Sequence, residues 1–252
     1  MTSQFTLRKL LVTLSLAACS LSTLAAVQVY GPGGPAPAMQ EAAKQFQKNT
    51  NIQVNVTAGP TPKWAEQAKQ NADVIYSGSE AMMSDFENTF ASQIVKDSIE
   101  PLYLRAAAIV VRPGNPKNIK GFKDLARNNH KVLVTHGAGQ VGLWEDIAGR
   151  SGDIQLLKGV RKNIASYAAN TAVAKETWTK DSSYDAWVVY NIWSVANPEL
   201  GQLVAIEPEL VIYRDTGVAL TQQGVANKEA AQFVQFLKSN QAKAIFQKYG
   251  WK

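Results

Sequence analysis

Short apolar segments alternate with longer amphipathic segments from residue 27 to the end of the chain. The apolar segments are typical of strands and lie at residues 27–30, 52–56, 73–76, 102–111, 131–135, 186–190, 203–206, 211–213 and 218–220. Helical spacing of apolar residues predicts helices at residues 38–48, 63–71, 122–127, 143–150, 172–178 and 228–247. This alternation of strand and helix predicts an α/β fold in which helices pack on a sheet.

Two long extended segments suggest how the chain is divided. Residues 102–111 and 203–213 are the best candidates for crossing between two lobes. A second lobe that is inserted between two halves of the first needs two such crossings. We therefore expect a first lobe of residues 27–106 and 206–252, a second lobe of residues 107–205, and a ligand cleft between them.

The first 26 residues have the features of an export signal rather than of a folded element. Arg8 and Lys9 precede an apolar stretch at residues 10–18, which is too short to span a bilayer. Ala25 and Ala26 offer a cleavage site that follows a small residue. This segment is therefore predicted to be a signal peptide, which is removed when the protein reaches the periplasm.

A second interpretation of the leader stays open. Residues 16–19 resemble a bacterial lipobox, in which Cys19 would be lipidated and become the new N-terminus. Only seven residues would then separate the lipid anchor from the first strand. Because Cys19 is the only cysteine, a chain cleaved after residue 25 or 26 has no disulfide, and its fold rests on its apolar core.

The net charge of the chain is mildly positive. Loss of Arg8 and Lys9 with the leader leaves 24 of the 26 basic residues against 20 acidic ones, which lowers the net charge from +6 to +4. The sequence has no run of five or more like charges. This balance suits a small acidic ligand better than nucleic acid, which requires a clustered basic patch.

Two glycine turns, each between a strand and a helix, are the most informative local pattern. The turn at residues 31–35 contains Gly33 and Gly34, and the turn at residues 137–142 contains Gly139. Glycine lets the backbone approach a ligand closely, and the free N–H groups and dipole of a helix N-terminus attract negative charge. The two turns together predict one small anion held between two lobes.

The second glycine turn also matches the G-x-G-x-x-G fingerprint of dinucleotide-binding folds. That fingerprint requires an acidic residue after a second strand about 20 residues later, whereas the corresponding segment, residues 156–162, is basic. We therefore expect no nucleotide cofactor. Two interpretations remain, an anion-binding turn that includes Ala138, Gly139 and Gln140, and a purely structural turn.

Further polar positions are candidates for contacts with an anion. Ser77, Gly78 and Ser79 follow a strand and precede a helix, so their hydroxyls and amides could donate to a ligand or cap the helix. Thr61 lies between two prolines and has the same two interpretations. Arg105 interrupts an apolar strand, where its guanidinium needs a carboxylate or a ligand as partner unless it faces solvent.

The sequence contains no motif that would indicate an enzyme or a metal site. His130 and His136 are its only histidines, and neither belongs to an H-E-x-x-H motif. A G-x-S-x-G elbow and a convincing acid–base pair are also missing. We expect a binding protein without catalytic activity, cofactor or metal.

Several segments resemble periplasmic solute-binding proteins of the molybdate/sulfate-binding class. These segments lie at residues 73–79, 104–116 and 242–251, and three more, at residues 30–35, 100–105 and 137–146, are similar to the accessory colonization factors within that class. The resemblance covers nearly all of the chain after the leader. It implies the two-lobe periplasmic-binding-protein type II fold, with hinge closure over one anion.

The ligand-binding loops of the molybdate-binding relatives can be placed on this chain. The resemblance puts them at Gly33 and Gly34, at Pro60 and Thr61, at Ala138 and Gly139, at Thr171 and Ala172, and at Tyr190. Molybdate binders have a serine in the first loop, where this chain has glycine and proline, so one hydroxyl donor is missing. Arg105, Ser77 and Ser79 are candidates to replace it.

The resemblance also implies a role. It is that of the ligand-binding component of an ABC-type importer, with a small anion and a membrane permease as partners. A sulfate-like oxyanion is the favoured ligand, and a carboxylate such as aspartate or citrate is the alternative. A chemosensory or colonization protein without a transport role has the same pattern. We expect a monomer that binds no nucleic acid.

The leader predicts the N-terminus of the exported protein. Intact-mass measurement of the protein from the periplasm is expected to show a chain that begins near Val27 and carries no lipid. A diacylated Cys19 at the N-terminus would instead support the lipobox interpretation.

Overall fold

The computed structural model describes residues 26–127 and 129–252, apart from the side chain of Ala138. Within these residues nine strands form one mixed sheet in the order β2-β1-β3-β9-β4-β7-β5-β6, and β8 pairs with β4. The strands are β1 Val27–Gly31, β2 Val54–Ala58, β3 Val74–Tyr76, β4 Glu100–Val111, β5 Val132–Thr135, β6 Ile164–Ala168, β7 Ala186–Tyr190, β8 Gln202–Ala205 and β9 Tyr213–Leu220. The α/β fold predicted from the sequence pattern is confirmed.

Ten α-helices accompany the sheet in the described part of the chain. They are α1 Ala36–Thr50, α2 Ala65–Asn71, α3 Glu80–Thr89, α4 Leu143–Gly149, α5 Ile154–Asn163, α6 Thr171–Lys180, α7 Asn191–Ala196, α8 Gln222–Ala226, α9 Lys228–Leu237 and α10 Asn240–Lys248. None of these helices is long and apolar enough to cross a membrane. The predicted leader lies outside the described residues except for Ala26.

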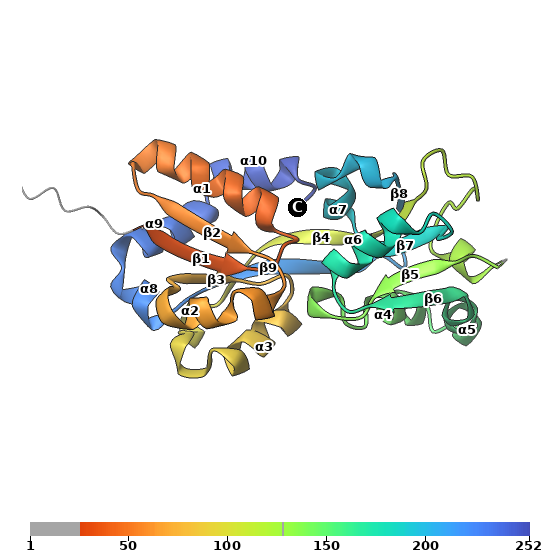
Figure 1. Cartoon of the computed structure of the whole chain (residues 1–252), viewed down its shortest axis with the longest axis horizontal. Coiled ribbons are helices and arrows are strands. Elements are labelled where there is room, and N and C mark those ends of the chain that lie inside the picture. The colour runs from red at the N-terminus through yellow and green to blue at the C-terminus, as the bar shows by residue number, and fades with distance from the viewer. Residues whose placement is uncertain (1–25, 128) are drawn as a thin grey trace, which may run out of the picture.

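The first strand shows how the sheet holds a core on each of its faces. Val29 is buried in a cluster with Met39 and Phe46 of α1, whereas the next residue, Tyr30, is buried in a second cluster with Trp64. Successive strand residues point to opposite faces, so a strand that is apolar on both faces needs cover on both sides. Figure 1 shows this cover, with α1 and α10 on one side of the strands and α2 and α3 on the other.

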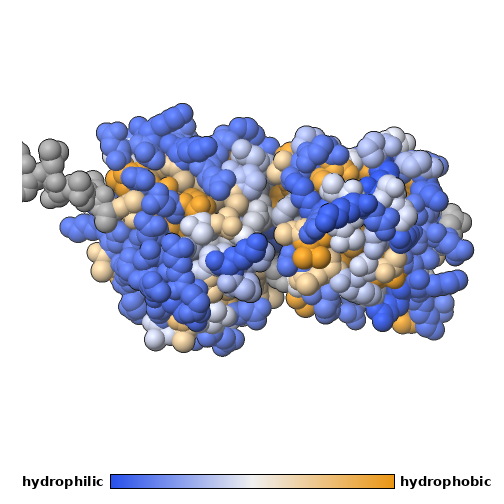
Figure 2. All heavy atoms as spheres, viewed as in Figure 1, coloured by the Kyte–Doolittle hydropathy of each residue, from blue (hydrophilic) through white to orange (hydrophobic). Residues whose placement is uncertain are grey.

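The long strand β4 belongs to two lobes. Its residues 100–106 pair with β9, and its residues 107–111 pair with β7 and β8. Strands β1–β3 and β9 with helices α1–α3 and α8–α10 form lobe 1, and β5–β8 with α4–α7 form lobe 2. Figure 1 shows the two lobes joined along β4 and β9, and Figure 2 shows them as two masses that meet at a narrow boundary.

Several stretches differ from the predicted elements. Helices α7 and α8 are not predicted, and two other stretches differ for local reasons. The pattern predicts no element at residues 154–168, where the structure has α5 and β6, because the buried apolar residues of α5 are only Leu156 and Val160. The pattern predicts one helix at residues 228–247, where the structure has α9 and α10. The second helix begins anew because the hydroxyl of Ser239 caps it, accepting a hydrogen bond from the N–H of Ala242.

The second crossing also differs from the prediction. Residues 203–213 are not one extended segment, because β8 ends at Ala205 and a turn at residues 208–210 precedes β9. The two extended pieces predicted at residues 211–213 and 218–220 are largely one strand, β9, which is polar in its middle. The strand that runs between the lobes beside β4 is therefore β9 itself.

Gly31→Ala tests the packing at the end of β1. A Cβ atom at Gly31 would lie 2.6 Å from ring carbons of Tyr76, which is fully buried and whose hydroxyl donates to Pro32 O at 3.0 Å. We expect the free energy of unfolding, measured by denaturant titration, to fall by about 1–3 kcal/mol, as for other overpacked cores. Gly33→Ala is the control, because no atom lies within 4 Å of its Cβ position. Equal stability of the two variants would contradict this packing.

Candidate anion-binding site

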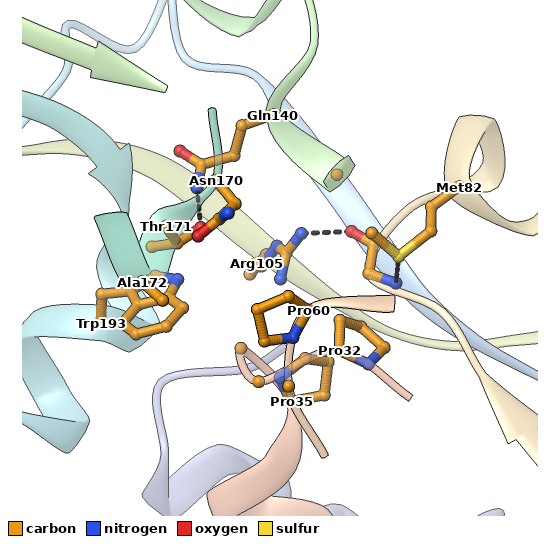
Figure 3. A pocket seen from close by; sticks show the side chains of 15 residues that line it. Pro32, Pro35, Pro60, Met82, Arg105, Gln140, Asn170, Thr171, Ala172 and Trp193 are labelled. Carbon is orange, nitrogen blue, oxygen red and sulfur yellow. Dashed lines mark hydrogen bonds between the residues drawn. The ribbon is translucent and has the colours of Figure 1, made fainter. Parts of the chain in front are cut away.

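A cavity of about 100 Å³ lies between the two lobes. Lobe 1 contributes the loops that follow β1, β2 and β3, together with Met82 of α3 and Arg105 of β4, and lobe 2 contributes the 3₁₀ turn η5 (Ala138–Gln140), the start of α6, and Trp193 of α7. The lining residues are Pro32, Gly33, Gly34, Pro35, Gly59, Pro60, Gly78, Met82, Arg105, Gly139, Gln140, Asn170, Thr171, Ala172 and Trp193. Figure 3 shows Arg105 between the proline loops and the group formed by Gln140, Asn170 and Thr171.

Arg105 is the only charged side chain among the described residues that line the cavity. It is 3% exposed, and no carboxylate in the described chain forms an ion pair with it. Its Nη2 donates to the carbonyl oxygen of Gly78, and its Nε is buried without a hydrogen bond. A buried cation without a carboxylate partner is costly, so this arrangement favours an anion in the cavity.

Two aromatic rings flank the guanidinium. Its central carbon lies 3.9 Å from the ring centroid of Tyr190 and 5.3 Å from that of Trp251. Burial lowers the pKa of Arg105, while Tyr190 and Asp215 oppose this shift, and burial also raises the pKa of the Tyr190 hydroxyl. Because a guanidinium keeps its proton in proteins, Arg105 is a cation held against a neutral phenol.

Three glycines give the guanidinium its space. A Cβ atom would lie 3.1 Å from Arg105 Nη1 at Gly34, 3.2 Å from Nη2 at Gly78, and 3.1 Å from Nη2 at Gly139. At Gly139 of lobe 2 it would also lie 2.8 Å from the carbonyl oxygen of Gly78 in lobe 1. The lobes therefore touch backbone to backbone beside Arg105, which only glycine allows at this distance.

The N-termini of two helices face the cavity from opposite lobes. Helix α1 begins directly after Gly33, Gly34 and Pro35, and helix α6 begins at Thr171, after Asn170 as its N-cap. The first N–H groups of a helix have no partner within it and carry the positive end of the helix dipole. Because no acidic side chain among the described residues lines the cavity, these N–H groups and Arg105 together favour a negative ligand.

The loop after β3 supports Arg105 through its backbone. Gly78 accepts from Arg105 through its carbonyl oxygen and donates its N–H to Met82 Sδ at 3.3 Å, and Figure 3 shows both contacts. The Ser77 hydroxyl accepts from Gly217 N–H at 3.2 Å, and the Ser79 hydroxyl caps α3 by accepting from Met82 N–H at 3.2 Å. Both hydroxyls are therefore used within the protein.

The structure places eight of the predicted site residues around the cavity. These residues are Gly33, Gly34, Gly78, Arg105, Gly139, Gln140, Thr171 and Ala172. Of the others, Thr61 lies beside Pro60 at the start of a 3₁₀ turn, Ala138 lies in η5, and Tyr190 lies under Arg105 with its hydroxyl donating to Gly139 O at 3.0 Å. Ser77 and Ser79 are buried outside the lining.

Sequence reasoning does not find several lining residues. They are Pro32, Pro35, Gly59, Met82, Asn170 and Trp193. Asn170 has a visible signal as a helix cap, and its side chain accepts from Val173 N–H at 3.0 Å. Met82 and Trp193 have the helical spacing of ordinary core residues, so their place at the cavity depends on how distant segments pack. The described residues contain no cluster of three or more His, Cys, Asp or Glu placed to hold a metal.

The fold and the site define a class of protein. Two α/β lobes that share crossing strands and enclose a cavity form the periplasmic-binding-protein type II fold, as in the putative molybdenum transporter component of Clostridium difficile, which is 17% identical with a TM-score of 0.66. The sequence matches the family model of bacterial extracellular solute-binding proteins over residues 27–252. The chain therefore belongs to that family, and the solute-binding class predicted from its motifs is confirmed.

Solved structures agree with this assignment. PEB3 bound to L-phospholactate is 38% identical, with 90% of this chain and 99% of PEB3 covered and a TM-score of 0.85. PEB3 from Campylobacter jejuni has the same identity and coverage and a TM-score of 0.84. The molybdate-binding protein of Azotobacter vinelandii is 17% identical over 90% of this chain and 98% of its own, with a TM-score of 0.68, which shows the fold alone. A comparison of this chain with curated proteins found no match.

Gly139→Ala tests the contact between the lobes. The new Cβ atom would meet Gly78 O at 2.8 Å and Arg105 Nη2 at 3.1 Å, so the lobes must move apart or the core must strain by about 1–3 kcal/mol. We expect a larger radius of gyration in small-angle scattering and a lower melting temperature. Gly149→Ala is the control, because nothing lies within 4 Å of its Cβ position. Unchanged scattering and melting in Gly139→Ala would contradict the contact.

Proposed function

We propose that this protein captures a small anion in the periplasm for an ABC-type importer, and that the anion carries a sulfate-like head group. The observation that carries the proposal is Arg105, a buried cation at the cavity between the lobes that forms no ion pair with a carboxylate in the described part of the chain. An anion would supply the missing charge, and closure of the lobes would remove both charges from water together. Membership in the solute-binding family supports the capture role and a membrane permease as partner.

The cavity lining combines a few polar groups with a larger apolar surface, and this composition narrows the class of ligand. Arg105, the glycine loops and the start of α6 supply the polar groups, and Pro35, Pro60, Met82 and Trp193 lie among them. A bare inorganic ion would leave this apolar surface without a partner. We therefore favour a small organic phosphate or sulfate ester, whose carbon skeleton faces the apolar surface. PEB3, with its bound L-phospholactate, supports this class because that ligand joins a phosphoryl group to a small organic acid.

A carboxylate such as aspartate or citrate is the second candidate. The reason is the guanidinium itself, since its fork of donors matches a carboxylate as well as a tetrahedral oxyanion. The phospholactate held by PEB3 also contains a carboxylate. Both candidates use the polar groups of the cavity, and they differ in how many anionic groups the ligand carries.

We propose the lobe boundaries expected from the sequence, with residues 27–106 and 206–252 in lobe 1 and residues 107–205 in lobe 2. The change of partners along β4 supports this division, because β9 pairs up to Ala106 and β7 begins at Ala107. Rotation about this point would open and close the cavity, as in other hinged binding proteins.

We further propose that the protein acts as a monomer after removal of its leader.

The proposed role of the protein in transport has one alternative. Residues 30–35, 100–105 and 137–146 are similar to accessory colonization factor C, so a chemosensory or colonization role without transport uses the same cavity. Uptake of labelled ligand by cells with and without the gene distinguishes the two roles. Loss of uptake supports the importer, and unchanged uptake with intact ligand binding supports the alternative.

Thermal-shift measurements test the ligand class. The panel contains L-phospholactate, sulfate, molybdate, phosphate, aspartate and citrate. We expect an organic phosphate to give the largest stabilisation, which reaches about 2.7 kcal/mol at a hundredfold excess over Kd. A larger shift in melting temperature with free sulfate would indicate an inorganic oxyanion as the ligand. The absence of a shift with all of these anions would contradict the capture of an anion.

Arg105→Ala tests the residue on which the proposal depends. If the anion pairs with this buried guanidinium, calorimetry should show a loss of about 3–5 kcal/mol in binding free energy, with a smaller loss in Arg105→Lys. The control is Arg112→Ala, because Arg112 stacks on Trp178 at 3.6 Å and donates to backbone carbonyls away from the cavity. That variant should lose stability but keep its affinity. Full affinity in Arg105→Ala would remove Arg105 from the site.

A further inference from the structure

The chain ends in a short tail that leaves α10 and returns to the middle of the molecule. After α10 ends at Lys248, Gly250 adopts a positive φ of 88°, which turns the backbone toward β4. The last residue, Lys252, then exchanges two backbone hydrogen bonds with Leu104, of 2.7 and 3.0 Å. Leu104 is the residue immediately before Arg105, so the tail is fixed beside the cavity arginine.

The tail also contacts lobe 2. The Asn191 side chain donates to the carbonyl oxygen of Gly250 at 2.7 Å, and Asn191 is the first residue of α7, directly after Tyr190. A Cβ atom on Gly250 would lie 3.0 Å from Asn191 Nδ2 and 3.2 Å from Val195 Cγ2. Figure 1 shows the end of the chain between α10 of lobe 1 and α7 of lobe 2. The tail therefore bridges the two lobes near the point where β4 changes partners.

Trp251 is the side chain by which the tail reaches the site. It is 3% exposed, packs edge-on against Phe246 with ring centroids 5.9 Å apart, and lies 5.3 Å from the guanidinium carbon of Arg105. Tyr190 of lobe 2 flanks the same guanidinium at 3.9 Å. One ring therefore comes from each lobe, and each gives a buried cation–π contact.

Few hydrogen bonds determine where the guanidinium points. Its Nη2 bonds to Gly78 O, the Tyr190 side chain forms a second hydrogen bond with it, and its Nε is buried without a partner. These bonds hold one edge of the guanidinium, and the rings of Tyr190 and Trp251 beside it restrict the tilt of its plane. The orientation of Arg105 thus depends on Trp251 and Tyr190, and the position of Trp251 depends on the backbone bonds of Lys252 and on Asn191.

We propose that residues 249–252 form a clasp that joins the two lobes at the hinge, and that Trp251 is a positioning residue that orients Arg105. The clasp holds Arg105 in place while the lobes rotate, so that the arginine is already oriented when an anion arrives. The orientation of Arg105 is independent of which anion binds, and only the effect on affinity rests on the proposed function.

The first experiment observes Arg105 without ligand. The Nε–Hε signal of Arg105 in a ¹⁵N-correlated NMR spectrum is assigned by its disappearance in Arg105→Lys. We expect Trp251→Leu to move this signal and accelerate its exchange with water, and Trp251→Phe to restore most of the original position. Trp64→Leu is the control, because Trp64 is also buried in lobe 1 but packs against Phe86 and Phe90. A signal that stays unchanged in Trp251→Leu overturns the positioning role.

Affinity and hydrogen exchange complete the test. With L-phospholactate as the probe, Trp251→Leu should bind about three- to thirtyfold more weakly, the range expected for one buried cation–π contact. Asn191→Ala should accelerate exchange of the backbone N–H groups of Leu104 and Lys252, because it releases the tail from lobe 2. If these two N–H groups exchange at an unchanged rate in Asn191→Ala, the proposal that the tail bridges the two lobes is wrong. The NMR and exchange results decide the proposal even if the probe fails to bind, an outcome that would count against the proposed ligand alone.

Discussion

A guanidinium held out of water at the junction of two lobes constrains the structure around it. Desolvation makes such a charge costly. One backbone carbonyl, two aromatic rings and the charge of Asp215, which forms no ion pair with Arg105, offset part of this cost, while the positive ends of two helices at the cavity add to the need for an anion. A protein carboxylate bonded to Arg105 would stabilise the empty protein and weaken ligand binding. The glycines at positions 34, 78 and 139 follow from the same constraint, because the backbone must approach this side chain from three directions.

The parts of the cavity come from elements that are far apart in the chain. Lobe 1 provides the cation and the proline loops, and lobe 2 provides η5, the N-terminus of α6 and Trp193. Neither lobe alone surrounds the cavity, so the proposed capture of an anion requires both lobes. The close approach of Gly78 and Gly139 limits how near the lobes can come to each other in this structure.

Local patterns were sufficient for most of the elements and for part of the site. Apolar alternation located most of the strands, though not β6, and glycine between strand and helix pointed to Gly33, Gly34 and Gly139, because turn chemistry is a property of neighbouring residues. The Ser77 and Ser79 hydroxyls, by contrast, accept hydrogen bonds from the N–H groups of Gly217 and Met82, and these bonds could not be predicted from the local sequence. The pairing of β4 with three strands and the return of the tail to Leu104 depend on contacts between distant segments, which no local window contains. For the same reason, Trp193 has no feature in the sequence that separates it from a core tryptophan.

The place of β9 in the sheet has a consequence for the order in which the chain can fold. β3 pairs with β9, whose residues follow about 140 positions later, so the sheet of lobe 1 stays incomplete until almost the whole chain is available. The proposed lobe 2 is one contiguous stretch, and its strands pair with one another and with β4 alone. Closing so long a loop is entropically unfavourable and slow. We therefore expect the free edge of β3 to stay unpaired until the C-terminal part of the chain is available, so that the half of the site that carries Arg105 forms late in folding.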